Sequence, residues 1–210
     1  MTALLTLVQW LSPGFPTGAF ACSHGLETVI AQGVVRDSSS LRDWLCGVLE
    51  HGAGWQDAVL LAQALVPGAD HDALGALARA LAPSAERLTE TLDQGAAFAR
   101  TVAAITGQPL PPRALPIAVG QAAAPLGLPP ETVISLYLQG FVGNLCTVAV
   151  RHVPLGQTEG QAVLAALAPQ IAALARRAAT ASLDDLGGCA LAADLAAMTH
   201  ETQTIRIFRT

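Results

Sequence analysis

The sequence predicts an all-α protein, a single-domain bundle of about eight to ten helices. Hydrophobic residues make up 52% of the 210 residues but aromatic residues only 4%, so alanine and leucine dominate, which favours helices over strands. Apolar residues recur at helical spacing between glycine and proline breaks. Charged residues amount to only 13%, which is low for a fully hydrated surface. We therefore expect a partner chain to cover part of the surface.

The first third of the chain predicts four helical segments. A short apolar segment covers residues 2–11, and a first long helix covers 18–32, bounded by prolines and a glycine. Ser40 and Asp43 resemble a capping box for the next helix, and a further helix is expected over 56–66. Four residues share one apolar face of the second long helix: Leu41, Leu45, Val48 and Leu49.

The middle of the chain is divided by clear breaks. Asp70 is placed to cap a helix that ends near residue 80, and Pro83-Ser84 precedes a helix reaching about residue 105. The segment 107–113, GQPLPPR, has the strongest loop composition in the chain. Residues 115–126 are expected to be weakly helical.

The last third predicts three further helices. Pro130 suits the first turn of an uncharged helix over 131–150. Thr158 and Gln161 form a capping box for a helix that reaches about residue 180, which Pro169 should kink. A final helix is expected over 188–199, and strand alternation is conceivable only near 204–208.

Charge and composition exclude several classes of function. The formal net charge is −5, and all 11 basic residues are arginine, so the chain has neither a Walker A lysine nor a Schiff-base lysine. No basic run exists, which argues against nucleic-acid binding. The first basic side chain is Arg36, so the basic region of a signal peptide is missing. The segment 132–150 approaches the length of a membrane span, but Gln139 and Asn144 favour a helix buried in protein. We expect no membrane partner.

Cysteines and histidines offer two alternative chemistries near the start of the chain. The four cysteines are scattered, which suits a reducing cytoplasm rather than a disulfide framework. Cys22 and His24 could bind a metal only if they lie in a loop, because residues two apart on a helix point in different directions. Cys22 could also pair with a histidine as a nucleophile, although no recognisable signature surrounds it.

The C-terminal tail, residues 200–210, has two possible arrangements. Phe208 lies between Arg206 and Arg209, so it could insert into a partner's pocket while the arginines pair with carboxylates. Alternatively, the tail docks on its own domain. Because termini rarely hold a core together, we expect deletion of the tail to leave the fold nearly intact.

Three blocks together resemble the UreF family of urease accessory proteins. They are LSPGFPTGAFACSHGLE near the N-terminus, YLQGFVGNLCTVAVRHVPLGQTEGQ at 137–161, and MTHETQTIRIFRT at 198–210. The resemblance implies an all-α homodimer that is not an enzyme and has no cofactor of its own. It implies binding to a second accessory protein, UreD or UreH, recruitment of the GTPase UreG, and assistance in loading nickel into apo-urease. The resemblance is compatible with two roles for this protein: it modulates the UreG GTPase, or it forms part of a passage for nickel.

The resemblance also assigns residues. It implies one UreF-like domain over 1–210 with a partner-binding tail at 200–210, and it places the helix bearing Tyr137, Gly140 and Asn144 in the core or in a dimer contact. The residues expected near partners are Pro16, Thr17, Gly18, Phe20, His24, Gly25, Glu27, His200, Glu201, Arg206, Phe208 and Arg209.

Three functional hypotheses therefore stand side by side. The first is an adaptor that works by protein contacts, supported by the three blocks and the lack of a catalytic constellation. The second is a small helical hydrolase or transferase that uses Cys22 and a histidine. The third is a direct nickel carrier, for which the candidate ligands are Cys22, His24 and His200.

Overall fold

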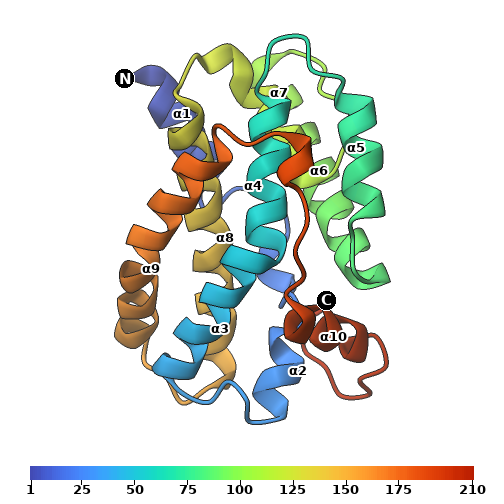
Figure 1. Cartoon of the computed structure of the whole chain (residues 1–210). Coiled ribbons are helices and arrows are strands. Elements are labelled where there is room, and N and C mark those ends of the chain that lie inside the picture. The colour runs from blue at the N-terminus through green and yellow to red at the C-terminus, as the bar shows by residue number, and fades with distance from the viewer.

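The computed structural model describes residues 1–210 and contains ten α-helices and no strand (Figure 1). This confirms the predicted all-α class. The helices are α1 (Thr2–Trp10), α2 (Leu26–Ala31), α3 (Ser38–His51), α4 (Ala53–Ala64), α5 (His71–Ala80), α6 (Ala85–Thr106), α7 (Leu115–Ala123), α8 (Pro130–His152), α9 (Gln157–Ala178) and α10 (Leu191–His200). Three short 3-10 turns lie at Ala19–Ala21, Ala124–Leu126 and Leu183–Asp185.

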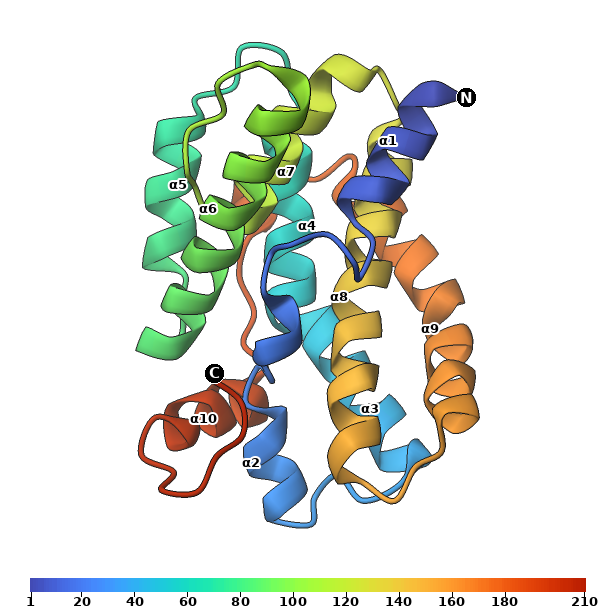
Figure 2. The ribbon, with the colours of Figure 1, turned by 180° about the vertical axis from the view of Figure 1, so that it is seen from behind.

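The helices form a bundle with α4 and α8 near its middle. Helices α3 and α9 lie on one side, and α5, α6 and α7 on the other, as the front and back views agree (Figures 1 and 2). The larger of two clusters of buried hydrophobic residues has 37 members and connects elements from both halves of the chain. Helices α2 and α10 pack together at the end of the bundle opposite α1.

Helix α8 is a core helix. By length and hydropathy it could cross a membrane, but it packs against α2, α4 and α9. The side chains of Val133, Ile134, Leu138, Val142 and Leu145 are buried in the bundle. The prediction of an uncharged helix buried in protein is confirmed.

The prediction of one long helix over 18–32 is wrong. A 3-10 turn at Ala19–Ala21 is followed by two residues with left-handed backbone, His24 at φ 58° and Gly25 at φ 74°, and α2 begins only at Leu26. Left-handed residues cannot continue a right-handed helix. Cys22 and His24 therefore lie in a loop.

Helix starts follow the predicted kinds of cap, with shifts in position. Asp70 accepts the Ala73 N–H at 2.9 Å and Ser84 accepts the Arg87 N–H at 3.2 Å, as predicted. The capping box of α3 uses Asp37 and Ser40 rather than Ser40 and Asp43, since Asp37 accepts the Ser40 N–H at 2.8 Å.

Two further boundaries differ from prediction. At α9, Glu159 accepts the N–H of Gly156 at 2.8 Å, so this helix starts before the predicted Thr158 cap. Helix α4 starts at Ala53 instead of residue 56, with only Gly52 between it and the end of α3, because Gly54 lets its backbone approach Leu49 closely. No strand forms near residues 204–208.

Candidate functional site

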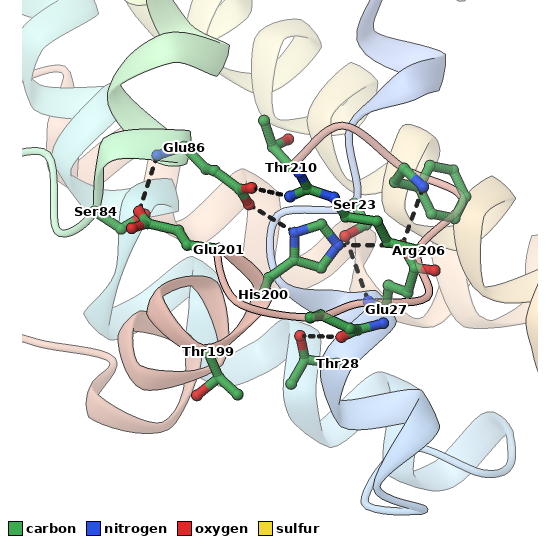
Figure 3. A network of polar contacts seen from close by, with 12 residues as sticks. Ser23, Glu27, Thr28, Ser84, Glu86, Thr199, His200, Glu201, Arg206 and Thr210 are labelled. Atoms are coloured by element: carbon green, nitrogen blue, oxygen red, sulfur yellow. Dashed lines mark hydrogen bonds and ion pairs between the residues drawn. The ribbon is translucent and has the colours of Figure 1, made fainter.

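The opening loop and the C-terminal tail meet in the fold. The N–H of Ser23 donates to the carbonyl oxygen of Thr210 at 2.6 Å, and the N–H of Arg209 donates to that of Ala21 at 2.8 Å. Figure 3 shows the end of the tail lying beside the loop and α2. Of the two arrangements predicted for the tail, the structure shows the one docked on its own domain.

Phe208 anchors this tail in the hydrophobic core. Its side chain is buried, and its ring lies edge-on to His152 at the end of α8, with 5.2 Å between ring centroids. Thr210 is buried as well. The tail therefore contributes to the core, and in place of a nearly intact fold we now expect its deletion to expose the apolar surface that Phe208 covers.

Glu27 of α2 is the main acceptor for the tail. Its carboxylate accepts the N–H of Ile207 at 2.8 Å and the N–H of Phe208 at 3.0 Å, and it lies 3.1 Å from Nε2 of His200. Burial alone would raise the pKa of Glu27, but these donors outweigh burial and lower its pKa. A carboxyl whose pKa is lowered on folding stabilises the fold at pH values above its pKa in the unfolded chain. This stabilisation is lost as pH falls through the lower pKa of the folded state. Acid should therefore loosen the tail.

His200 joins two carboxylates at the end of α10. Its side chain is completely buried, and its Nδ1 lies 2.6 Å from Oε2 of Glu86 on α6. The other oxygen of Glu86 accepts from Arg206 of the tail. We call Glu27, Glu86, His200 and Arg206 the carboxylate clasp (Figure 3). It joins α2, α6, α10 and the tail into one unit.

A second ion pair, on α6, contacts the end of the tail. Arg87 forms a buried ion pair with Glu90, whose Oε2 also accepts from the Thr210 hydroxyl at 2.7 Å. Burial would raise the pKa of Glu90, but the Arg87 guanidinium and His24 hold it well below its usual range. Burial and the nearby Arg87 lower the pKa of His24. Buried charges are tolerated when paired in this way.

The surroundings of Cys22 do not favour a role in catalysis or metal binding. Its thiol is buried, and burial together with the nearby Glu90 raises its pKa, so the thiolate that a nucleophile or metal ligand requires is disfavoured. Both ring nitrogens of His200 already face carboxylates. No group of three or more histidine, cysteine, aspartate or glutamate side chains is arranged to hold a metal ion.

The residues predicted to lie near partners divide into two sets. The residues of the first set are buried and hold the loop and tail together: His24, Gly25, Glu27, His200 and Phe208. In the second set they are exposed or partly exposed around that unit: Pro16, Thr17, Gly18, Phe20, Glu201, Arg206 and Arg209. Only the second set is accessible to another protein in this arrangement.

Sequence reasoning missed an exposed apolar stripe on α10. Leu191, Leu195 and Met198 point to solvent, whereas the small residues Ala193 and Ala197 face the bundle. The large and small residues are thus reversed relative to an ordinary amphipathic helix. Their spacing of four and three residues is the signal that could have identified the stripe. In the tail, Ile205 and Ile207 are also largely exposed.

The second sequence block, residues 137–161, lines a groove against the opening loop. The groove measures about 420 Å³ and is lined mainly by α1, the opening loop, α6 and α8. Asn144 donates from Nδ2 to the Cys22 carbonyl oxygen at 3.3 Å, and a Cβ at Gly140 would lie 3.1 Å from the Leu11 carbonyl oxygen. Tyr137 is buried, and its hydroxyl donates to Asp57 at 2.6 Å. These contacts place Tyr137 in the core of the helical bundle.

Asp57 gives a pH-dependent prediction. Burial raises its pKa from 3.8 to about 6, although the Tyr137 hydroxyl opposes the shift. Between pH 3.8 and about 6 the carboxyl is ionised in the unfolded chain but still protonated in the folded one. The free energy of unfolding should therefore fall as pH rises through this range. Asp57→Asn should therefore raise the free energy of unfolding by about 2 kcal/mol near pH 7.5 and by much less near pH 4.5. Urea denaturation at both pH values checks this, and an equal effect at both would contradict it.

Two glycines of the opening loop provide a matched pair of variants. Both have positive φ, but a Cβ at Gly25 would lie 2.7 Å from the Ala197 backbone nitrogen, whereas a Cβ at Gly18 meets open space. Gly18→Ala should cost about 1 kcal/mol for backbone strain alone. Gly25→Ala should cost at least about 2 kcal/mol more, because α10 must move away from α2. Equal losses in thermal denaturation would show that the close contact is unimportant.

Comparison with known proteins identifies close relatives. The UreF family model matches residues 35–168. A protein of Cereibacter sphaeroides (strain ATCC 17029) named "Urease accessory protein UreF" is 65% identical over 208 residues, covering 99% of each chain. Proteins of the same name from Roseobacter denitrificans and Paracoccus denitrificans are each 55% identical over 99% of this chain and 94% and 96% of their own.

Proposed function

Because the chain belongs to the UreF family of urease accessory proteins, we propose that it is a cytoplasmic adaptor for nickel insertion. In this proposal it acts as a homodimer and binds a UreD/UreH-type accessory protein. The complex recruits the GTPase UreG and delivers nickel to apo-urease. Nickel is the cargo of the complex, and the adaptor has no cofactor of its own.

The exposed apolar stripe of α10 is the main support for an adaptor. Leu191, Leu195 and Met198 present large apolar side chains to water along one face of α10, and Ile205 and Ile207 of the tail that follows α10 are exposed as well. Contiguous exposed apolar side chains of this kind mark protein interaction sites. We call Leu191, Leu195, Met198, Ile205 and Ile207 the α10–tail surface.

Charged groups around this surface supply a polar rim. Arg209 pairs with Asp93 at 3.2 Å with both side chains exposed, and Glu201 is exposed at the end of α10. An apolar centre with a charged rim is the usual composition of a protein interface. Phe20, two-thirds exposed on the opening loop, is a further exposed apolar side chain.

The buried set has a supporting role in this proposal. Glu27 and His200 fix the tail on α2 and, through Glu86, on α6, and the buried Phe208 anchors its end. A surface held rigid before binding loses less entropy when the partner docks. These residues therefore position the interface rather than touch the partner.

Co-expression tests the proposal. The chain is produced with a UreD-type protein and with UreG, and complexes are analysed by size-exclusion chromatography with light scattering. We expect a homodimer alone, a complex with the UreD-type protein, and UreG in the complex only when the UreD-type protein is present. Failure to form any complex with a soluble UreD-type protein would overturn the adaptor role.

A further inference from the structure

A small cavity lies where the opening loop, α4, α6 and α10 meet. It measures about 40 Å³, and every residue that lines it is buried or half-buried. Its polar side chains include His24 of the opening loop, Asp57 of α4, Arg87 of α6 and Asp194 of α10. A cavity of this size has room for at least one water molecule.

His24 brings an unpartnered polar atom to this cavity. Its side chain is only 6% exposed, and Nδ1 of its ring has no hydrogen-bond partner. The nearest carboxylate oxygen is Oε1 of Glu90 at 3.9 Å, which is too far for a direct hydrogen bond. A gap of this length between two buried polar atoms is typical of a site where water forms the bridge.

Arg87 and Asp57 have further hydrogen-bonding capacity that the protein does not use. The guanidinium of Arg87 carries five N–H donors, and the ion pair with Glu90 is the only polar contact of its side chain. In the Asp57 carboxylate only Oδ2 accepts a hydrogen bond, from the Tyr137 hydroxyl. Buried polar groups in native proteins are almost always hydrogen-bonded, either to protein or to ordered water. Unused donors and acceptors from three separate elements therefore meet at one cavity.

The charges in the cavity wall determine which class of ligand fits. The Arg87 guanidinium repels a cation, and the carboxylates of Asp57 and Asp194 repel an anion. Water is small and neutral, and it both donates and accepts hydrogen bonds. It can therefore accept from Arg87 and donate to Asp57 at the same time.

We propose that this cavity is an internal hydration site, in which ordered water bridges His24, Asp57 and Arg87. The bridge joins the opening loop to α4 and α6, since no direct hydrogen bond connects these three side chains. Ala193 and Ala197 of α10 form part of the wall, so the water lies behind the helix that carries the exposed apolar stripe. The hydration site is a property of the isolated chain, and its test is independent of the proposed adaptor role.

A crystal structure of the full-length protein, at a resolution that shows ordered water, is the first test. We expect water within about 3.2 Å of a His24 ring nitrogen and of either Asp57 or Arg87. A dry cavity, or density for a metal ion or an anion inside it, would overturn the proposal.

Nuclear Overhauser effects between water and methyl groups test the same site in solution. Leu60 lines the cavity and Leu61 does not, although both side chains are almost completely buried on α4. In protein labelled with 13C at its leucine methyl groups, water should show an effect to Leu60 and none to Leu61. Absence of the effect at Leu60 would contradict ordered water in the cavity.

A cavity-filling variant distinguishes this water from other sources of the signal. Ala78→Leu on α5 adds side-chain volume at the cavity wall, whereas Ala76→Leu changes an exposed residue of the same helix. The effect at Leu60 should be lost in Ala78→Leu and retained in Ala76→Leu. An effect that persists unchanged in a folded Ala78→Leu protein would place the water elsewhere and overturn the proposal.

Discussion

Replacing Glu27 with glutamine is expected to free the C-terminal tail and to lower the free energy of unfolding by about 3 kcal/mol. The Glu27 carboxylate accepts three hydrogen bonds, two from the tail backbone and one from His200. The amide of glutamine would present a donor where an acceptor is needed. The fully buried ring of His200 would also lose one of its two carboxylate partners.

Urea denaturation measures the loss of stability, and limited trypsin digestion after Arg206 and Arg209 measures release of the tail. Asp93→Asn is the matched control, because it removes a carboxylate that also holds the tail but is exposed, as is its partner Arg209. An exposed ion pair contributes at most about 1 kcal/mol. If both variants lose stability equally, Glu27 is not the anchor of the tail.

Replacing Leu195 with aspartate is expected to abolish capture of the UreD-type partner while leaving the fold intact. Leu195 lies at the middle of the α10 stripe and is 52% exposed, so the change removes few internal contacts. A charge at the centre of an apolar interface should weaken binding at least roughly a hundredfold. The free energy of unfolding should change by no more than about 0.5 kcal/mol.

Ile105→Asp is the control for Leu195→Asp. Ile105 is 53% exposed, near the C-terminal end of α6, whereas α10 packs beside the N-terminal end of that helix (Figure 2). Pull-down with the UreD-type protein should succeed with Ile105→Asp and fail with Leu195→Asp. The reverse pattern would place the interface at the other end of the bundle.

The helical bundle could be predicted from the sequence because its signals are local. Asp70 and Ser84 cap the helices that follow them, and Leu41, Leu45, Val48 and Leu49 form the buried face of α3. The start of α2 could not be predicted, because the left-handed residue His24 is not a glycine and its conformation depends on the packing around it.

The candidate site depends on contacts between residues far apart in the sequence. Glu27 binds the amide of Ile207, 180 residues later in the chain, and no spacing rule connects them. The stripe on α10 was missed for a different reason. In that helix alanines face the bundle, where Gly25 approaches the Ala197 backbone, so the large apolar residues that usually indicate the buried face point outward.

Site-specific photo-crosslinking tests the central claim most directly, namely that the α10–tail surface is the contact for the UreD-type protein. A photoreactive amino acid is introduced at Leu195 in one sample and at Ile105 in another, and each chain is co-expressed with the UreD-type protein and irradiated. We predict a crosslink between the two proteins from position 195 and none from position 105. A crosslink from 105 alone, in a complex that forms normally, would contradict the account and place the partner elsewhere on the bundle.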